Sequence, residues 1–392
     1  MKIVVLVESF TFGGAERQAC VLAGEFKRRG HQVCVATYDR DDFYRPLLEQ
    51  ENVEHCFLGG HGKVSWALSV RRFLRTRGQD VVLAFLPGPS AYAELAGLPS
   101  RSWGLVVSER STGVVHRPWF KTCLHMFADY VAVNSHSARI AIEKRFPRLR
   151  SKLITLYNAI RVEAPVPGVQ VPVAPHLVRL IVAARLDRNK NARGLLSALH
   201  ALKDSQPHLR VHVDWYGDQK AAPEVVREAQ KGITDLGLNG VFRIHPPTNN
   251  IHDLMSQADA VVLPSFYEGL PNAVCEGMAL GKPILMSAVC DARNLVKEGD
   301  NGFLFDPHNS NSIADALARF ARLTSADRDR MGRASRARAE ELFDVNTVAE
   351  RYLRVLEAAA ERKALKIEHW PEQVPETALR ASEPSRGGPV RR

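Results

Sequence analysis

Short apolar runs alternate with amphipathic stretches along most of the chain. Residues 3–7 are continuously apolar and rich in β-branched side chains, which is typical of a strand buried on both faces of a parallel sheet. Gly13 and Gly14 interrupt the pattern, and apolar positions at helical spacing then predict a helix that ends near Gly30. The next apolar run, at residues 33–36, completes a strand–loop–helix–strand unit.

The same alternation continues through two regions of the chain. In the first region, further strands are predicted at 81–85, 104–107, 130–133 and 153–156. In the second region, strands are predicted at 178–183, 210–216, 241–244, 260–263 and 283–287, and helices at 192–203, 223–236, 251–257 and 271–280. Strands that alternate with helices predict an α/β protein with doubly wound parallel sheets.

A proline-rich segment at residues 164–175 separates the two regions and predicts a linker. We therefore expect an N-terminal domain at 1–163 and a C-terminal domain at 176–342, with a ligand cleft between them. A helical stretch follows from about 311 to 364, and the polar tail at 363–392 is expected to be disordered.

Charge narrows the choice of partners. A formal net charge of +10 favours an anionic partner, such as nucleic acid, lipid headgroups or a diphosphate. The sequence has no zinc-finger spacing, no aromatic RNA-binding motif and no long Lys/Arg block, so we expect no nucleic-acid partner.

The cysteines and the apolar runs predict the compartment. Six cysteines are scattered without a C-x-x-C pair, which favours free thiols in a reducing compartment. No stretch approaches the roughly 18 to 20 apolar residues that span a bilayer, and the first apolar run is too short for a signal peptide. We therefore expect a cytoplasmic protein.

The segment 265–281 carries the most specific chemistry. It follows an apolar run and opens a helix at Pro271, where free backbone N–H groups beside Gly269 suit phosphate oxygens. Glu268 and Glu276 flank this turn. A carboxylate beside a diphosphate is unfavourable unless it accepts hydrogen bonds from hydroxyls, which a sugar and a ribose supply.

This segment resembles the E-x7-E signature of the retaining glycosyltransferases of family 4. The resemblance implies the GT-B fold, with two Rossmann-like domains facing a central cleft, the acceptor on the N-terminal side and the donor on the C-terminal domain. It implies that Glu268 contacts the transferred sugar and Glu276 the ribose hydroxyls. It also implies that a helix at 343–362 returns to the N-terminal domain. Further donor-binding positions by this resemblance are Gly269, Leu270, Pro271 and Asn272.

Residues 183–191 lie at the carboxyl end of a predicted strand, where ligands collect in open α/β sheets. Arg185 and Lys190 match basic positions of the family, and the resemblance implies that they stabilise the charge that develops on the leaving diphosphate. Gly217 matches a glycine near the nucleotide. A solvated basic loop is the alternative, and Arg188, which is out of step with the family spacing, is expected to face water.

In the N-terminal domain, Gly13 and Gly14 resemble the glycine-rich loop of the family and are expected to touch the diphosphate or the acceptor. A tight turn without a ligand is the alternative. Many members carry a histidine in the loop after the strand at 104–107, where this chain has Glu109 and Arg110. We expect these two residues to bind the acceptor or the sugar, with His116 as a substitute only if the loop folds back.

The resemblance implies a hexosyltransferase that uses a nucleotide-sugar, a UDP-sugar first, and a saccharide or lipid-linked acceptor in surface polysaccharide or lipopolysaccharide biosynthesis. We expect no cofactor and no metal, because the Asp-x-Asp pairs at 39–41 and 327–329 adjoin neither donor segment. The basic, aromatic stretch 116–121 indicates either a peripheral site on the inner face of the plasma membrane or a solvated loop. Alternatives are an epimerase or phosphorylase of the same fold, and a non-catalytic nucleotide-sugar-binding subunit of a glycosyltransferase complex.

Overall fold

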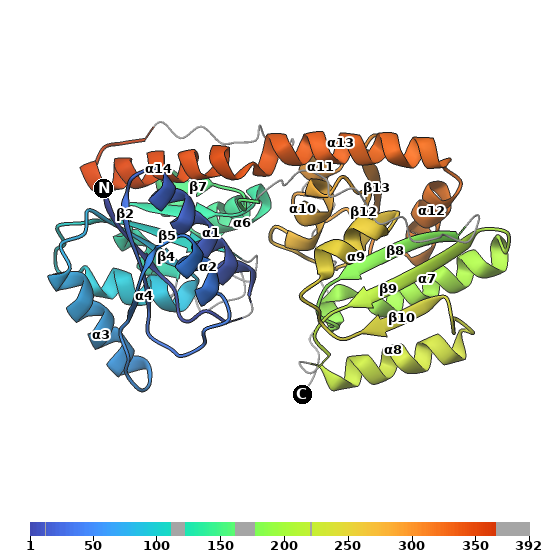
Figure 1. Ribbon diagram of the computed structural model, residues 1–392, viewed down its shortest axis with the longest axis horizontal. Helices are drawn as coiled ribbons and strands as arrows, with labels where there is room; N and C mark the ends of the chain where they lie inside the picture. The colour runs from blue at the N-terminus through green and yellow to red at the C-terminus, as the bar shows by residue number, and fades with distance from the viewer. Residues whose placement is uncertain (12, 111–121, 161–176, 220–221, 366–392) are drawn as a thin grey trace. The chain divides into compact units, whose positions relative to one another are not determined.

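The computed structural model describes residues 1–11, 13–110, 122–160, 177–219 and 222–365, which form two units. The described residues up to 160 and those from 343 to 365 make the first unit, and residues 177–342 make the second. Helix α14 (Val345–Glu361) therefore packs in the first unit although it follows the second unit in the sequence (Figure 1). The predicted linker at 164–175 and the tail beyond 365 lie outside the described residues.

The first unit is built on a parallel sheet of seven strands in the order β3-β2-β1-β4-β5-β6-β7. The strands are β1 (Lys2–Leu6), β2 (Gln32–Thr37), β3 (Glu54–Phe57), β4 (Val81–Phe85), β5 (Gly104–Glu109), β6 (Tyr130–Val133) and β7 (Leu153–Thr155). Its helices are α1 (Gly14–Arg28), α2 (Arg45–Gln50), α3 (Lys63–Thr76), α4 (Pro87–Ala96) and α6 (His136–Arg145), with 3₁₀ turns η2 (Leu124–Phe127) and η3 (Pro147–Lys152).

Alternate residues of each strand in this sheet enter two different cores. In β1, Ile3 and Val5 join a core formed with α1 and α14, whereas Val4 and Leu6 join a core formed with α3, α4 and α6. Both faces are thus covered by helices, which explains why the strand is apolar at every position. Helix α14 lies so close to β5 that a Cβ atom at Gly104 would collide with the backbone of Ala359.

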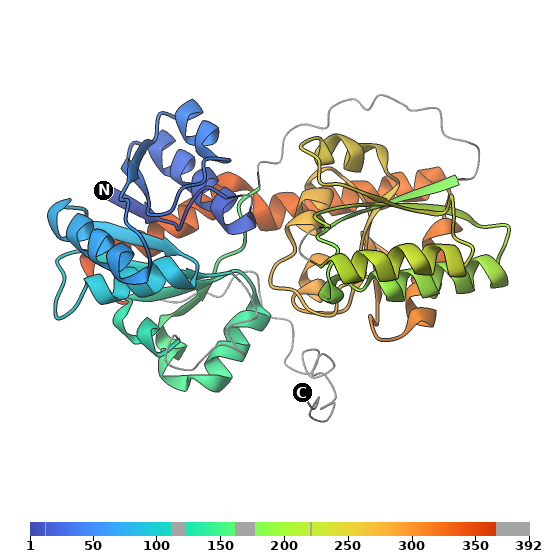
Figure 2. The same cartoon turned by 90° about the horizontal axis from the view of Figure 1, so that it is seen from below.

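The second unit holds a parallel sheet of six strands in the order β10-β9-β8-β11-β12-β13. The strands are β8 (Leu177–Ala183), β9 (Arg210–Tyr216), β10 (Phe242–His245), β11 (Ala260–Leu263), β12 (Ile284–Ser287) and β13 (Gly302–Phe305). The helical elements are η4 (Arg188–Lys190), α7 (Ala192–Ser205), α8 (Pro223–Asp235), α9 (Ile251–Gln257), α10 (Asn272–Ala279), α11 (Ala292–Leu295), α12 (Ser310–Ala321) and α13 (Ser325–Phe343). Helices α7 and α8 pack side by side (Figure 2).

The expected doubly wound parallel architecture is confirmed in both units. Two strands were not expected. Strand β3 is a half-exposed edge strand that mixes Glu54 and His55 with apolar residues, and β13 is a run of only four residues. The helical stretch expected from 311 to 364 is divided into α12, α13 and α14. All six cysteines are free, and no helix in the described ranges is long and apolar enough to cross a membrane.

Candidate active site

The predicted donor residues of the second unit gather at the carboxyl edge of its sheet. Strands β9, β8 and β11 are neighbours and run parallel, so the segments that follow them leave the sheet at the same edge. Gly217 follows β9, Arg185 follows β8, and Glu268 follows β11. Four sequence segments that are far apart in the chain, those near 185, 217, 245 and 268, are thereby brought to one edge.

Two asparagines fix the loops that carry this chemistry. The backbone carbonyl of Asn189 accepts from the Phe266 N–H at 2.9 Å, and its side-chain amide donates to the Tyr267 carbonyl at 2.9 Å and accepts from the Tyr267 N–H at 3.1 Å. Asn191, buried with a left-handed φ of 56°, caps α7 and donates to the Pro264 carbonyl at 3.1 Å. Because both loops are joined in this way, residues 185–191 hold a fixed position against residues 264–268.

Lys190 and Glu268 are brought into direct contact by this arrangement. The Lys190 Nζ donates to Glu268 Oε1 at 2.5 Å, and both side chains are mostly buried, with 16% and 11% of their surface exposed. An ion pair that is largely withdrawn from water is screened much less than one on the surface. The cation predicted for the diphosphate and the carboxylate predicted for the sugar are therefore neighbours.

The other two basic residues of this loop are more open. Arg185 is exposed and lies 3.7 Å from the carboxylate of Asp187, whose side chain caps η4. Arg188 is exposed and faces Glu228 of α8 at 3.4 Å. The expectation that Arg188 faces water is confirmed, which makes it a suitable control for Lys190.

Gly217 allows a close approach between two strand ends. A Cβ atom at this position would collide with the carbonyl oxygen of Ala184, which also accepts from the Trp215 indole at 2.8 Å. The backbone N–H of Gly217 donates to the His245 carbonyl at 3.3 Å. The glycine is therefore required for the shape of this edge, whatever contact it makes with a ligand.

Glu276 has a histidine partner that the sequence did not predict. It lies in α10, which begins at Asn272 after Pro271 in the N-cap position, and Leu270 is buried beneath this turn. His252 Nε2, on α9, lies 3.0 Å from Glu276 Oε2. His252 precedes Glu276 by 24 residues on a different helix, so no short motif could have connected them.

A second histidine cluster lies on β9 and β10. Asp214 is 2.7 Å from His245 and 3.2 Å from His212. Burial alone would raise the pKa of Asp214, but the hydrogen bonds and charges of the two histidines lower it to about 2. His245 also stacks on Tyr216, with ring centroids 4.4 Å apart. His245 is therefore held by contacts within its own unit.

In the first unit, the glycine loop meets a carboxylate of its own chain. Gly13 is the N-cap of α1 and Gly14 its first residue, and the carboxylate of Glu16 lies where a Cβ of Gly13 would be. Burial raises the pKa of Glu16, as do the charges of Glu8 and Asp41. A carboxylate at a helix N-terminus occupies the position that favours phosphate. The contact of Gly13 and Gly14 with a diphosphate therefore stays a prediction. The Glu16 carboxylate would compete with a phosphate for this position.

Glu109 is buried beside a histidine, and its contact with an acceptor or a sugar stays a prediction. It ends β5, is 2% exposed, and its Oε1 lies 3.2 Å from His125 Nε2. The Nδ1 atom of His125 lies 2.8 Å from Glu94 on α4. Burial alone would lower the pKa of His125, but the hydrogen bonds that its ring donates to the Glu109 and Glu94 carboxylates raise it to about 9. Glu94, Glu109 and His125 thus form a buried cluster in the first unit.

Arg110 is likewise held inside the first unit. Its guanidinium lies 5.0 Å from the Phe85 ring centroid and donates to the Tyr352 hydroxyl of α14 at 3.2 Å. These contacts join Arg110 to α14, and its expected contact with an acceptor or a sugar stays a prediction. His116 and the stretch 116–121 lie outside the described residues.

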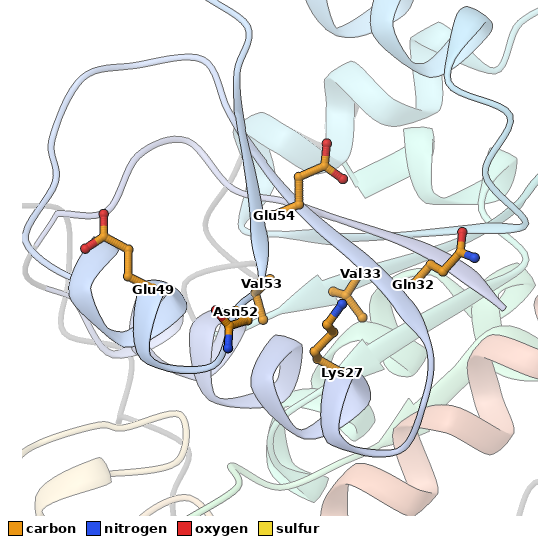
Figure 3. Close-up of a pocket in the computed structure, with 7 residues that line it drawn as sticks. All are labelled: Lys27, Gln32, Val33, Glu49, Asn52, Val53 and Glu54. Atoms are coloured by element: carbon orange, nitrogen blue, oxygen red, sulfur yellow. The ribbon is translucent and has the colours of Figure 1, made fainter.

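A pocket of the first unit lies away from these residues (Figure 3). The pocket lies beside the first residues of β2 and β3, at the edge of the sheet opposite to the carboxyl ends of these strands. Its lining comprises Lys27, Gln32, Val33, Glu49, Asn52, Val53 and Glu54. None of the residues predicted for catalysis or donor binding lines it.

One group of side chains in the described part of the chain has the composition of a metal site. The ligand atoms of Cys34, Glu54 and Cys56 lie within 4.8 Å of one another. Arg77, however, pairs with the Glu54 carboxylate, and burial raises the pKa of the Cys34 thiol. A bound cation would have to displace a guanidinium and two thiol protons. We assign no metal to this group.

Comparison with known families gives two matches, one in each half of the chain. Residues 12–164 match Glycosyltransferase Family 4, and residues 175–338 match Glycosyl transferases group 1. The chain is 32% identical over 168 residues to a D-inositol 3-phosphate glycosyltransferase of Streptomyces griseus, a match that covers 41% of this chain and 35% of that protein. The chain spans half the length or less of the curated relatives it matches.

Solved structures resemble most of the chain. The structure of Anabaena Alr3699/HepE in complex with UDP has a TM-score of 0.78 and 22% identity, and covers 91% of this chain and 100% of its own. The lipopolysaccharide outer core galactosyltransferase WaaB has a TM-score of 0.71 and 16% identity, and covers 91% of this chain and 99% of its own. At these identities the likeness establishes the fold. The chain therefore has the GT-B fold, and its two halves match in order the family 4 and group 1 glycosyltransferase domains.

Proposed function

We propose that the protein is a retaining glycosyltransferase that moves a hexose from a nucleoside-diphosphate sugar, with UDP as the first candidate, to a saccharide or lipid-linked acceptor. The observation that carries the proposal is the 2.5 Å contact between Lys190 and Glu268. In such a donor the terminal phosphate is bonded directly to the sugar. A cation for the phosphate and a carboxylate for the sugar hydroxyls must then be neighbours, as these two residues are.

The proposed chemistry needs little from the protein beyond charge and position. The bond from the anomeric carbon to the phosphate oxygen breaks, and the acceptor oxygen bonds to the same face of that carbon. The acceptor proton passes to the leaving phosphate. Lys190 and Arg185 stabilise the negative charge that grows on the phosphate, while Glu268 orients the sugar. His252 orients Glu276, which accepts from the ribose hydroxyls.

The acceptor is proposed to belong to surface polysaccharide or lipopolysaccharide assembly. The likeness in fold to a protein of lipopolysaccharide synthesis supports this choice, and so does the net charge of +10, which suits an anionic lipid surface. A lipid-linked acceptor would hold the protein peripherally at the inner face of the plasma membrane.

A thermal-shift panel of UDP-, GDP- and ADP-sugars without metal tests the proposal. We expect one donor to stabilise the protein by about 2.7 kcal/mol at a concentration 100 times its Kd. The variant Glu276→Gln should lose most of this stabilisation, because it cannot accept from two ribose hydroxyls as well as a carboxylate does.

The matched control is Glu228→Gln, which changes an exposed carboxylate on α8 of the same unit and should keep the full shift. Product from the donor that binds is then analysed by NMR for the configuration at the anomeric carbon. Inversion would contradict the retaining mechanism. A shift without transfer to any acceptor would indicate the non-catalytic binding subunit instead.

His252→Ala is expected to weaken donor binding about fivefold, the effect of losing one net hydrogen bond of about 1 kcal/mol. The loss should disappear with a donor whose nucleotide lacks the ribose hydroxyls, since His252 acts through Glu276. His200→Ala is the control, because His200 is equally exposed and also pairs with a carboxylate, Asp204, but on α7. Equal losses with both donors would assign His252 a role other than positioning Glu276.

A further inference from the structure

Helix α3 of the first unit presents large apolar side chains to solvent. Val64 is 76% exposed and Leu68 62%, the two highest values among the large apolar residues in the described ranges. They are four residues apart, so they lie one above the other on one face of the helix. The opposite face is anchored, because Val70 and Leu74 are fully buried in the core. The exposed pair is therefore not needed to hold α3 on the sheet.

The same helix is strongly basic. The sequence of α3 contains no Asp or Glu, and Arg72 lies one further turn along the stripe of Val64 and Leu68. Arg71 and Arg75 donate to backbone carbonyls near the end of α4. Both reach the Leu98 carbonyl, Arg71 at 2.9 Å and Arg75 at 2.7 Å. These bonds fix the two guanidinium groups without neutralising them.

No acidic residue in the described ranges forms an ion pair with the bases of α3. The glutamate of the neighbouring helix α4, Glu94, is buried against His125 on the inner side. Leu95, at the end of α4, is 43% exposed, and its carbonyl accepts from Arg71 at 3.0 Å. We call Lys63, Val64, Leu68, Arg72, Arg75 and Leu95 the α3 surface. Figure 1 shows that α3 and α4 lie next to each other in the first unit.

Exposed apolar side chains on a helix that carries bases and no acidic residue favour one kind of partner. An amphipathic helix with Leu and Val between Lys and Arg suits a membrane interface, where apolar side chains reach the acyl boundary and bases contact phosphates. A second copy of this chain fits less well, since a two-fold contact would place the same arginines opposite one another. An anionic lipid surface satisfies both the charge and the exposed apolar area.

We propose that the α3 surface docks the protein on an anionic lipid bilayer, with Val64 and Leu68 inserted among the headgroups and Arg72 and Arg75 on lipid phosphates. The proposed lipid contact is related to the proposed function in one respect, since a lipid-linked acceptor would be presented at such a surface. The contact itself needs neither donor nor acceptor. It also differs from the contact predicted at 116–121, because it rests on residues that the structure describes.

Co-sedimentation of the full chain with phosphatidylcholine vesicles, with and without phosphatidylglycerol, tests the proposal in the absence of nucleotide-sugar. We expect binding only with phosphatidylglycerol and a decline with added salt. Arg72→Glu should weaken binding at least tenfold, since it reverses one charge at the surface. Val64→Ser/Leu68→Ser should weaken binding by a similar factor and leave binding more sensitive to salt.

The control variant is Arg330→Glu, which makes the same charge change at an exposed position of α13 in the second unit and should bind like the parent. An equal loss in Arg330→Glu would overturn the proposal in favour of attraction by net charge alone. Absence of binding to phosphatidylglycerol vesicles would overturn it as well. So would a concentration-dependent dimer, measured by light scattering, that only the α3 variants abolish. None of these results depends on sugar transfer, so failure here leaves the proposed activity standing.

Discussion

Replacing Lys190 by methionine is expected to lower kcat/KM for sugar transfer by about 10²–10³-fold, the usual cost of removing one preorganised group that stabilises developing charge. Lys190 is held by its contact with Glu268 and by loops that Asn189 joins, so its charge is in place before the donor binds. The loss should fall mainly on kcat, because the charge on the phosphate is larger in the transition state than in the bound donor.

Arg188→Met provides the control for this variant. It removes a cation two residues away in the same loop, but one that points to Glu228 and solvent, and it should change kcat/KM less than threefold. The affinity for free UDP, measured by calorimetry, separates binding from chemistry. A Lys190→Met enzyme that keeps its kcat would contradict the assignment and leave Lys190 only as the counterion of Glu268.

Replacing His125 by leucine is expected to cost about 3–5 kcal/mol of the free energy of unfolding of the first unit. The imidazole lies between Glu94 and Glu109, and all three side chains are buried. Without it, two carboxylates would remain inside the unit with no cation between them. Urea unfolding followed by circular dichroism measures the loss.

The pH dependence of stability identifies the cause of this loss. His125 has a folded pKa of about 9, above its unfolded value near 6.5, so its contribution is fully present below pH 6.5 and is lost as the pH rises through 9. The parent should therefore lose stability over this window, and His125→Leu should not. Adding Glu94→Gln and Glu109→Gln to His125→Leu should recover part of the loss. A cost below 1 kcal/mol for His125→Leu would mean that the cluster is not charged.

The architecture could be predicted because its signal is local. Buried parallel strands are apolar at every position, as residues 3–7 are, and most strands are followed by a helix with regular spacing. Strand β3 could not be predicted from its sequence, because an edge strand is covered on fewer sides and tolerates Glu54 and His55. Strand β13 could not be predicted because so short a run, one glycine and three apolar residues, is consistent with several structures.

The site could be predicted only where its residues follow one another in the sequence. Glu268 and Glu276 share a single strand–turn–helix segment, and Arg185 and Lys190 share one loop. The partners that position them come from elsewhere, as His252 does on α9. The buried partners of Glu109 could not be predicted for the same reason: Glu94 and His125 lie 15 residues before it and 16 after it, and a buried network of this kind has no pattern along the chain.

The return of α14 to the first unit affects the order in which the two units can finish folding during synthesis. Residues 177–342 of the second unit are continuous, whereas the core of the first unit includes Tyr352 and Leu356 from α14. Once α13 has left the ribosome, all described residues of the second unit are free to fold, while the earlier strands β1 to β7 still lack one covering helix. The unit that is translated first is thus the last to complete its fold. Until α14 packs, one apolar face of its sheet stays exposed, and chaperones bind surfaces of this kind.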